Sequence, residues 1–195
     1  MRLGELLGKI NNLKRMPRTG WLLCNVPLSE VEDVAQHSFE VATITLLLAD
    51  ELERSGMKVD YKRALSMAVI HDWAEALTAD FPYTALKYLG SEDVKKRMER
   101  SALKDLLRSL PRRDEYSKLW QEYSDKRTRE AKLVHAADYL SMMVQAIKYR
   151  EGSNRSRELD ELWLAVRTDL EPYVKEFPQV KKLVAGFRRR YEKIL

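Results

Sequence analysis

The segment HDWAEALTADFP, residues 71–82, places four titratable side chains directly after the apolar run ALSMAVI. These side chains belong to His71, Asp72, Glu75 and Asp80. An unpaired buried carboxylate is costly, so ionisable groups at the end of an apolar helix must be paired, protonated or bound to a metal ion. The segment therefore indicates a chemical site at the edge of the protein core.

Three expected helices each carry an ionisable residue where the helical period calls for an apolar one. His37, Asp72 and Asp138 occupy these positions, and His71 lies beside Asp72. A divalent cation would offset the charge of two buried carboxylates, and neutral imidazoles are good metal ligands. Two histidines and two aspartates would supply four ligands and leave positions for water, which is typical of a catalytic rather than a closed structural metal site.

Each of these residues also has a simpler interpretation. His37 is compatible with a hydrogen-bonded core histidine, Asp72 with a partner of an arginine, and Asp138 with a cap on a neighbouring helix. An adjacent His–Asp pair occurs often by chance. The joint pattern favours the metal site, because a histidine is followed by His–Asp 34 residues later and by an aspartate 66 residues after that, all at inward helical positions.

The elements that must position these residues are almost all helical by pattern, and no stretch alternates convincingly with a period of two. The sequence therefore predicts an all-α bundle of six to eight helices in one domain, residues 1–195. A long loop with two prolines and a glycine is expected at 16–33. The expected helices span residues 2–15, 34–54, 61–78, 91–110, 113–125, 127–150, 156–176 and 179–194.

Composition limits the class of protein. The chain of 195 residues is 45% hydrophobic and is long enough for one sizeable core. One cysteine, Cys24, excludes an intramolecular disulfide and favours a reducing, cytoplasmic setting. We expect no signal peptide and no membrane-spanning segment, since no apolar run approaches about 20 residues. The net charge of +5 is compatible with anionic ligands, but it is also common on solvated helical surfaces.

Three segments carry a resemblance to a known family: KRMPRTGW at 14–21, HDWAEALTADFP at 71–82 and LWQEYSDKRTREAKLVHAADYL at 119–140. With the order H…HD…D, they resemble the HD-domain metal-dependent phosphohydrolases, and in particular the YfbR-like 5′-deoxynucleotidase branch. The resemblance covers about residues 5–150. Helices in 156–194 would pack on this core or on a dimer partner.

The resemblance implies an HD-domain fold, a homodimer, and removal of phosphate from 2′-deoxyribonucleoside 5′-monophosphates with a transition metal such as Co²⁺ or Mn²⁺. It implies that Arg18 grips the phosphate, Trp21 shapes the nucleotide pocket, Glu75 polarises the attacking water and Asp80 meets the sugar 3′-hydroxyl. The implied metal ligands are His37, His71, Asp72 and Asp138.

The chemistry of these residue types agrees with that assignment, although alternatives remain. A guanidinium fork suits a phosphate, and a carboxylate four residues after a histidine shares its helical face. Trp21 is equally compatible with a loop anchor packed on the core, and Asp80 with the cap of a turn. Gln36 and Ala79 stand where the branch commonly has an acidic residue and a glycine.

Other functions remain open at the level of sequence. The first is an HD phosphohydrolase that acts on a nucleoside triphosphate, a cyclic dinucleotide or an alarmone. The second is a basic helical nucleic-acid-binding protein, for which GFRRRYEK at 186–193 is the best segment. Aromatic residues are sparse there, and three arginines on a terminal helix usually form a solvated face, so we expect no nucleic-acid partner.

Overall fold

The computed structural model describes residues 3–88 and 90–194, and within them the chain is helical without a β-strand. The predicted all-α fold is confirmed. Among the described residues, eight α-helices have eight residues or more, at the upper end of the expected number. These helices are α1 (Leu3–Ile10), α3 (Val34–Arg54), α4 (Tyr61–Ile70), α6 (Glu92–Leu107), α7 (Arg113–Asp125), α8 (Arg129–Glu151), α9 (Arg157–Glu176) and α10 (Pro178–Lys193).

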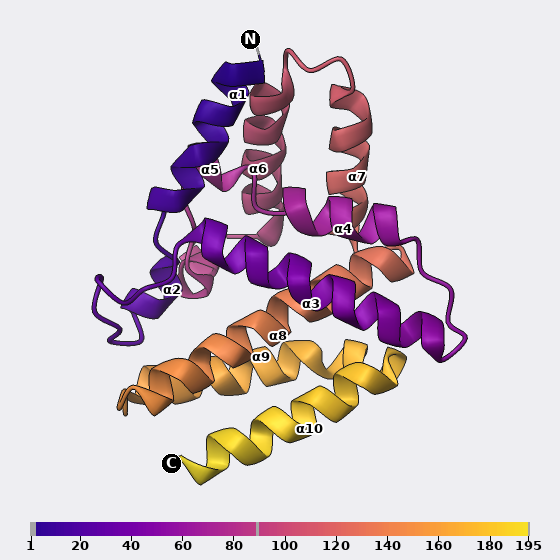
Figure 1. Cartoon of the computed structure of the whole chain (residues 1–195). Coiled ribbons are helices and arrows are strands. Elements are labelled where there is room, and N and C mark those ends of the chain that lie inside the picture. Colours follow the sequence, from indigo (N-terminus) through magenta and orange to yellow (C-terminus); the bar gives the residue numbers. More distant parts are fainter. Residues whose placement is uncertain (1–2, 89, 195) are drawn as a thin grey trace.

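Helices α3 and α8 form the centre of the bundle. Figure 1 shows α8, α9 and α10 as a layer on one side of α3, with α1, α6 and α7 gathered at the opposite end. Helix α4 packs against α3, α7 and α8, and thereby joins the two parts. This arrangement brings the middle of α3, the end of α4 and the middle of α8 to one place in the interior.

The expected helix over residues 61–78 is wrong in one respect, because it is interrupted between α4 and the one-turn helix α5 (Glu75–Thr78). The N–H of Glu75 bonds to the carbonyl of Asp72 at 3.0 Å rather than to that of His71. The carbonyl of His71 instead accepts a hydrogen bond from Trp120 Nε1 on α7, at 3.0 Å. The chain therefore tightens to three-residue hydrogen-bonded turns where the titratable residues cluster.

Two further expectations needed correction near the N-terminus. The helix expected over residues 2–15 is α1 followed by a 3₁₀ helix (Asn11–Arg15). The expected loop at 16–33 contains the one-turn helix α2 (Thr19–Leu22). Backbone bonds from Val34 to Met16 and from Arg18 to Glu32 close this segment into a compact loop. Its residues are thereby held against the start of α3.

A capping box begins α3. Asp33 Oδ1 accepts from the N–H of Gln36 at 2.7 Å, and Gln36 Oε1 accepts from the N–H of Asp33 at 2.9 Å. Gln36 is exposed, so it serves the helix terminus and does not reach the side chains around His37. The glutamine at position 36 thus acts on the helix cap.

Helices α9 and α10 pack on α8, and α10 also contacts α3 within the same chain. Arg150, at the end of α8, is 2% exposed and forms an ion pair with Asp160 of α9. The guanidinium also lies 5.1 Å from the ring centre of Tyr191 on α10, and that ring stacks on Trp163. Within the chain, these two helices therefore cover part of the core formed by α3 and α8.

In the part of the chain that the structure describes, none of the helices is both long and apolar enough to cross a bilayer.

Candidate metal centre and active site

The predicted metal ligands converge although they come from three separate elements. His37 lies on α3, His71 and Asp72 follow α4, and Asp138 lies on α8. His71 Nε2 is 3.0 Å from Asp72 Oδ2, and His37 Nε2 is 3.1 Å from Asp138 Oδ1 and 3.8 Å from Asp72 Oδ2. One ligand atom from each of His37, His71 and Asp72 falls within 4.8 Å of the others. Asp138 lies beside this group and contacts His37, but it is not among the residues whose ligand atoms all fall within 4.8 Å of one another.

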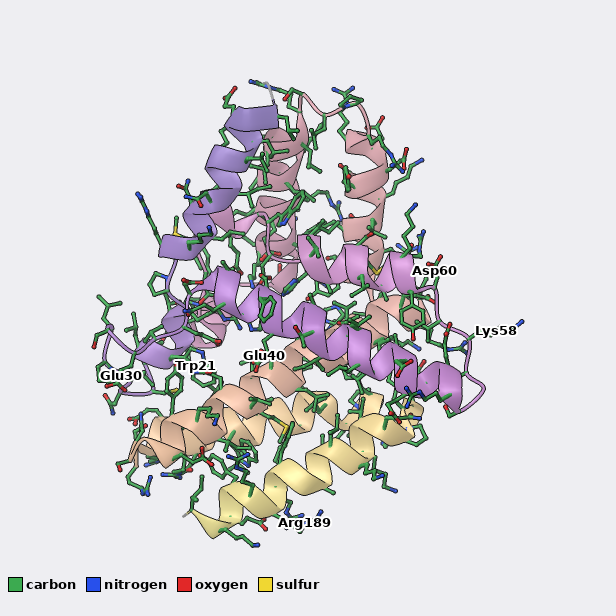
Figure 2. The ribbon with its side chains drawn as sticks, in the orientation of Figure 1. Trp21, Glu30, Glu40, Lys58, Asp60 and Arg189 are labelled. Atoms are coloured by element: carbon green, nitrogen blue, oxygen red, sulfur yellow. The ribbon has the colours of Figure 1, made fainter. Side chains whose placement is uncertain are left out.

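Hydrogen bonds at the far side of each ring define which nitrogen faces the cluster. His71 Nδ1 lies 2.7 Å from the carbonyl of Ala68, so Nδ1 carries the proton and donates it there. His37 Nδ1 lies 3.2 Å from Ser141 Oγ, which donates to Glu40 Oε2 at 2.7 Å. Figure 2 shows Glu40 on the side of α3 that faces α8. Both rings therefore turn a lone pair at Nε2 towards the carboxylates.

These facing atoms fit a divalent cation. His37 Nε2, His71 Nε2 and Asp72 Oδ2 are buried and form no hydrogen bond. A lone pair that faces a carboxylate oxygen at about 3 Å is repulsive unless a proton or a cation lies between them. Atoms that share an ion at ~2.1 Å lie about 3 Å apart, as these atoms do. Two imidazoles and carboxylates also form a donor set that first-row transition metals accept.

The carboxylates of this cluster are held in their charged form. Burial raises the pKa of Asp72, but the opposing effect of His71, His37 and Arg18 is larger. The pKa of Asp72 therefore lies well below its usual range. The pKa of Asp138 is also depressed, because contacts with His37 and the charge of His71 outweigh burial. Tyr123 supports Asp138, since its hydroxyl lies 3.4 Å from Asp138 Oδ2. The cluster thus presents stable negative charge to a cation.

Glu75 differs from its acidic neighbours Asp72 and Asp138, because its pKa is raised rather than lowered. Its side chain is buried, and Oε2 has no hydrogen-bond partner. Burial, followed by the charges of Asp72 and Asp80, raises the pKa of Glu75 well above its ordinary value, while Arg18 and Lys95 lower it. A carboxyl group with high proton affinity beside a metal cluster suits general acid–base catalysis.

Arg18 is held over the cluster by two acids. Arg18 Nη1 lies 3.5 Å from Asp72 Oδ2 and 3.8 Å from Asp80 Oδ1. Its pKa is raised above the ordinary value, because the charges of Asp80, Asp72 and Glu75 outweigh the effect of burial. The guanidinium is therefore permanently charged at the site, as phosphate binding requires.

Asp80 also fastens the loop that carries Arg18. Thr19 donates to Asp80 Oδ2 from its backbone N–H at 2.7 Å and from Oγ1 at 2.9 Å. Ala79, directly before Asp80, has φ 59° and ψ 171°, a conformation that glycine adopts readily and other residues rarely do. The departure from glycine at this position thus stores local backbone strain at the site.

Trp21 is a buried anchor as well as part of the site. It is 2% exposed, and its Nε1 donates to Glu32 Oε1 at 2.7 Å. Its ring meets that of Tyr149 edge-on, with centroids 5.2 Å apart. Figure 2 shows Trp21 on the α2 turn, beside α8. Trp21 also lines the cavity described next. Its buried position matches the interpretation as a loop anchor, and its role in shaping a nucleotide pocket stays a prediction.

A cavity of about 300 Å³ opens beside the cluster, and Arg18, Trp21, Glu75 and Asp80 all line it. Its other end reaches residues of α8 and α9, which give it an apolar wall. His135 also lines the cavity, but its ring stacks on Tyr123 at 4.1 Å, and its Nε2 lies 2.9 Å from the carbonyl of Tyr123. Besides His135 and Asp138, the lining residues from α8 and α9 are Tyr139, Met142, Leu162, Ala165, Val166 and Asp169.

Comparison with known proteins assigns this arrangement to a family. The model of the HD domain matches residues 10–181, which is most of the chain. The chain belongs to the HD-domain family. The membership expected from the order of histidines and aspartates is thereby confirmed.

Relatives of this HD-domain chain include named enzymes. The 5′-deoxynucleotidase HDDC2 of Mus musculus is 30% identical over 161 residues, which cover 82% of this chain and 75% of the mouse protein. A conserved hypothetical protein from Pyrococcus furiosus has a solved structure that is 40% identical, with a TM-score of 0.73 over 91% of this chain and 98% of that one. A "predicted metal-dependent phosphohydrolase" from Magnetospirillum magnetotacticum is 28% identical, with a TM-score of 0.64 over 96% and 92% of the two chains.

Several residues of this HD-domain site were not predicted from the sequence. Thr19 and Ser141 each make hydrogen bonds to partners more than 60 positions away, which no local pattern reveals. Glu32 is buried under Trp21 although it stands in a loop. Lys95 and Glu99 on α6 line the cavity. Their spacing of four residues was a visible signal, but it is equally common on solvated helices.

Proposed function

We propose that the chain is a metal-dependent 5′-deoxynucleotidase, which hydrolyses 2′-deoxyribonucleoside 5′-monophosphates to a deoxynucleoside and inorganic phosphate. The observation that carries the proposal is the pair of buried, unpaired nitrogens, His37 Nε2 and His71 Nε2, that face carboxylate oxygens. Family membership supports the phosphohydrolase chemistry, and the name of the mouse relative supports the substrate class.

In this proposal His37, His71, Asp72 and Asp138 hold one divalent cation, for which Co²⁺ and Mn²⁺ are the preferred candidates. A divalent cation held there supplies a Lewis acid, which makes water more acidic and offsets the negative charge of a phosphate. The unpaired Nε2 atoms and the depressed pKa values of Asp72 and Asp138 support this assignment.

Glu75 and Arg18 perform complementary tasks. Glu75 accepts a proton from the attacking water, since its burial gives its carboxylate a high proton affinity. Arg18 binds equatorial oxygens of the phosphate and holds the group for in-line attack, while charge develops on those oxygens. Both side chains line the cavity.

Asp80 and Trp21 bind the nucleoside. Asp80 Oδ2 already accepts twice from Thr19, which leaves Oδ1 to accept from the sugar 3′-hydroxyl. The N–H of Trp21 is occupied by Glu32, so Trp21 offers only its ring, as a wall against the base or sugar. This division leaves the selection of base to other residues of the cavity.

The proposal is tested by metal analysis of the purified protein and by phosphate release from a panel of deoxy- and ribonucleoside monophosphates. Asp72→Ala should abolish turnover with loss of bound metal, because a ligand is removed. Glu75→Ala should abolish turnover while the metal is retained. Full turnover in Glu75→Ala would contradict the role of Glu75, and release of pyrophosphate from triphosphates by the wild-type protein would assign a different substrate.

We also propose a homodimer in the cytoplasm. Phe39, Leu46 and Leu47 are 75%, 44% and 60% exposed and lie at spacings of seven and eight residues, so they form one apolar stripe on α3. A second copy of the chain would cover this stripe. Sedimentation velocity should give a dimer for the wild-type protein and a monomer for Leu47→Glu, and a monomeric wild-type protein would contradict the proposal.

A further inference from the structure

An ion pair on α6 stands at the wall of the cavity and has no role in the mechanism above. Lys95 Nζ lies 3.2 Å from Glu99 Oε1, one helical turn further along α6. The side chains are only 27% and 18% exposed, which is low for a lysine–glutamate pair on a helix. Both residues line the cavity, together with Glu75 and Asp72.

The acidic lining of the cavity favours further positive charge at the phosphate, in addition to the proposed divalent cation and Arg18. A phosphate monoester that enters the cavity carries up to two negative charges, and acidic side chains repel it there. Arg18 is shared between Asp72 and Asp80, so a large part of its charge is already offset. The acidic residues that line the cavity are Asp72, Glu75, Asp80, Glu99, Asp138 and Asp169.

Of the lysines that line the cavity, which are Lys95, Lys96 and Lys126, Lys95 is the one whose charge acts on Glu75 together with that of Arg18. Burial lowers the pKa of Lys95, but Glu99, then Glu75 and Asp72, raise it above the ordinary value. The effect is mutual, because Lys95 is one of the two charges that lower the pKa of the Glu75 carboxyl group. A protonated ammonium group therefore lies near the carboxylate that would activate water.

We propose that Lys95 is a second phosphate-binding residue, which contacts the substrate phosphate from α6 while Arg18 contacts it from the loop before α2. Glu99 is a positioning residue that holds the Lys95 side chain at the cavity wall before substrate binds. The proposal rests on the proposed function, because it concerns the phosphate of the same substrate.

The cationic side chains of Arg18 and Lys95 bind phosphate in different ways. The planar guanidinium of Arg18 can bind two oxygens at once, whereas the flexible ammonium of Lys95 is a point charge on a mobile stem. Glu99 competes with phosphate for Lys95 but also keeps the long side chain from extending into solvent. A lysine in this place raises the affinity for phosphate in the ground state and for the more charged transition state alike, so its loss changes both KM and kcat.

The test measures binding of inorganic phosphate to the metal-loaded protein by isothermal titration calorimetry, together with KM and kcat for a deoxynucleoside monophosphate. Lys95→Met should raise the dissociation constant of phosphate by about tenfold or more, as expected for loss of a charge-assisted contact. Lys95→Arg should stay within about threefold of the wild type, because it retains the charge. Lys104→Met, which removes an exposed lysine from the same helix, is the matched control and should change nothing.

Glu99→Gln separates a binding role of Lys95 from a purely structural one. If Lys95 binds phosphate, Glu99→Gln keeps an amide oxygen that can hold the Lys95 ammonium in place but removes the competing charge, so phosphate binds as tightly as in the wild type or more tightly. If the pair only stabilises α6, Glu99→Gln and Lys95→Met weaken phosphate binding equally, which would overturn the proposal. Unchanged phosphate binding in Lys95→Met would overturn it as well. Lys95→Gln, with circular dichroism and metal content measured, repeats the test should the methionine variant fold poorly.

Failure of the proposed function would be recognised separately. A wild-type protein that binds metal but releases no phosphate from any nucleoside monophosphate would contradict the proposed function. The calorimetric comparison between wild type and Lys95→Met remains decisive for Lys95 in that case, because it uses inorganic phosphate and needs no turnover.

Discussion

At His37 and His71 the two ring nitrogens have separate tasks. Nδ1 of each ring is bound to a protein oxygen, from Ser141 in one case and from the Ala68 carbonyl in the other. The tautomer of each imidazole is therefore set before any cation binds. The conformational entropy that is lost when the rings are oriented has already been lost on folding. A preorganised pair of this kind binds a cation without rearrangement of the core.

His135 is the third histidine of the chain, and its surroundings shift its pKa downwards. Burial, with Lys126 adding to it, lowers its pKa to about 4, although the hydrogen bond to the Tyr123 carbonyl acts in the other direction. The folded protein thus keeps His135 neutral below pH 6.5, where the unfolded chain would protonate it. Stability contributed by this neutral ring is present at pH 7 and is lost as the pH falls from about 6.5 towards 4.

The prediction is that His135→Gln flattens this part of the pH dependence. Between pH 7 and pH 4.5 the free energy of unfolding of the wild type should fall by about 2 kcal/mol more than that of the variant. Urea denaturation followed by circular dichroism at both pH values measures the difference. Equal losses in the two proteins would show that His135 titrates normally.

Individual residues of the site were predictable only where their position in a pattern was informative. His37, Asp72 and Asp138 interrupt apolar stripes, and this pattern, with His71 next to Asp72, predicted that these residues lie together. Ser141 was not predictable, because its partners, His37 and Glu40, are about 100 positions away in the sequence. The alignment of α3 with α8 creates those contacts, and helical periodicity carries no information on it.

At the scale of elements, the break between α4 and α5 shapes the site. The carbonyl of His71 accepts the indole N–H of Trp120, and backbone bonds spanning three residues follow up to the N–H of Leu77. A continuous helix would have placed Asp72 and Glu75 on a regular spiral. No glycine or proline marks the break, so the sequence predicted one helix, and the competing hydrogen bond from α7 decided the outcome.

The loop that carries Arg18 depends on Thr19, and Thr19→Val tests this. The variant removes the Oγ1 donor to Asp80 and keeps the backbone N–H donor. We expect KM for a deoxynucleoside monophosphate to rise several-fold and stability to fall by about 1 kcal/mol, with metal content unchanged. Steady-state kinetics and metal analysis measure these effects. Thr168→Val, at an exposed position on α9, is the matched control, and identical behaviour of the two variants would refute the role of Thr19.

Ala79 gives a prediction of opposite sign. Its positive φ is unfavourable for a residue with a Cβ, so Ala79→Gly should raise the free energy of unfolding by about 1 kcal/mol, even after the greater flexibility of glycine in the unfolded chain is counted. Ala42→Gly, inside α3, should instead lower it by about 1 kcal/mol. Urea denaturation of both variants checks the contrast. A loss of stability in Ala79→Gly would mean that the turn bears no strain.

At the scale of the whole molecule, one apolar cluster runs through α3, α8, α9 and α10. The sequence predicted a single domain of residues 1–195, and it left open whether the C-terminal helices cover this core or a partner. Amphipathic stripes identify the apolar face of a helix but not its neighbour. Members of the cluster from these elements include Leu48, Leu52, Leu140, Met143, Trp163, Leu170, Val180 and Tyr191.

The single-domain prediction is tested with Arg150→Met. The variant leaves Asp160 without its cation and removes the contact with Tyr191, so we expect a loss of about 2–3 kcal/mol. If the chain is one domain, urea unfolding stays a single transition shifted to lower urea. Arg157→Met breaks an exposed pair with Glu161 and should cost less than about 0.5 kcal/mol. Two separate transitions in the Arg150 variant would instead divide the chain into two units.

Cys24 gives the molecule a built-in reporter. It is the single thiol of the chain, it is 4% exposed, and burial with the charge of Glu158 raises its pKa to about 11. Its carbonyl accepts from Asn154 and from Ser156, so the sulfur lies where the segment after α2 meets the start of α9. A colorimetric thiol reagent will therefore react only when these two segments separate, and its rate will measure how often the folded protein opens there.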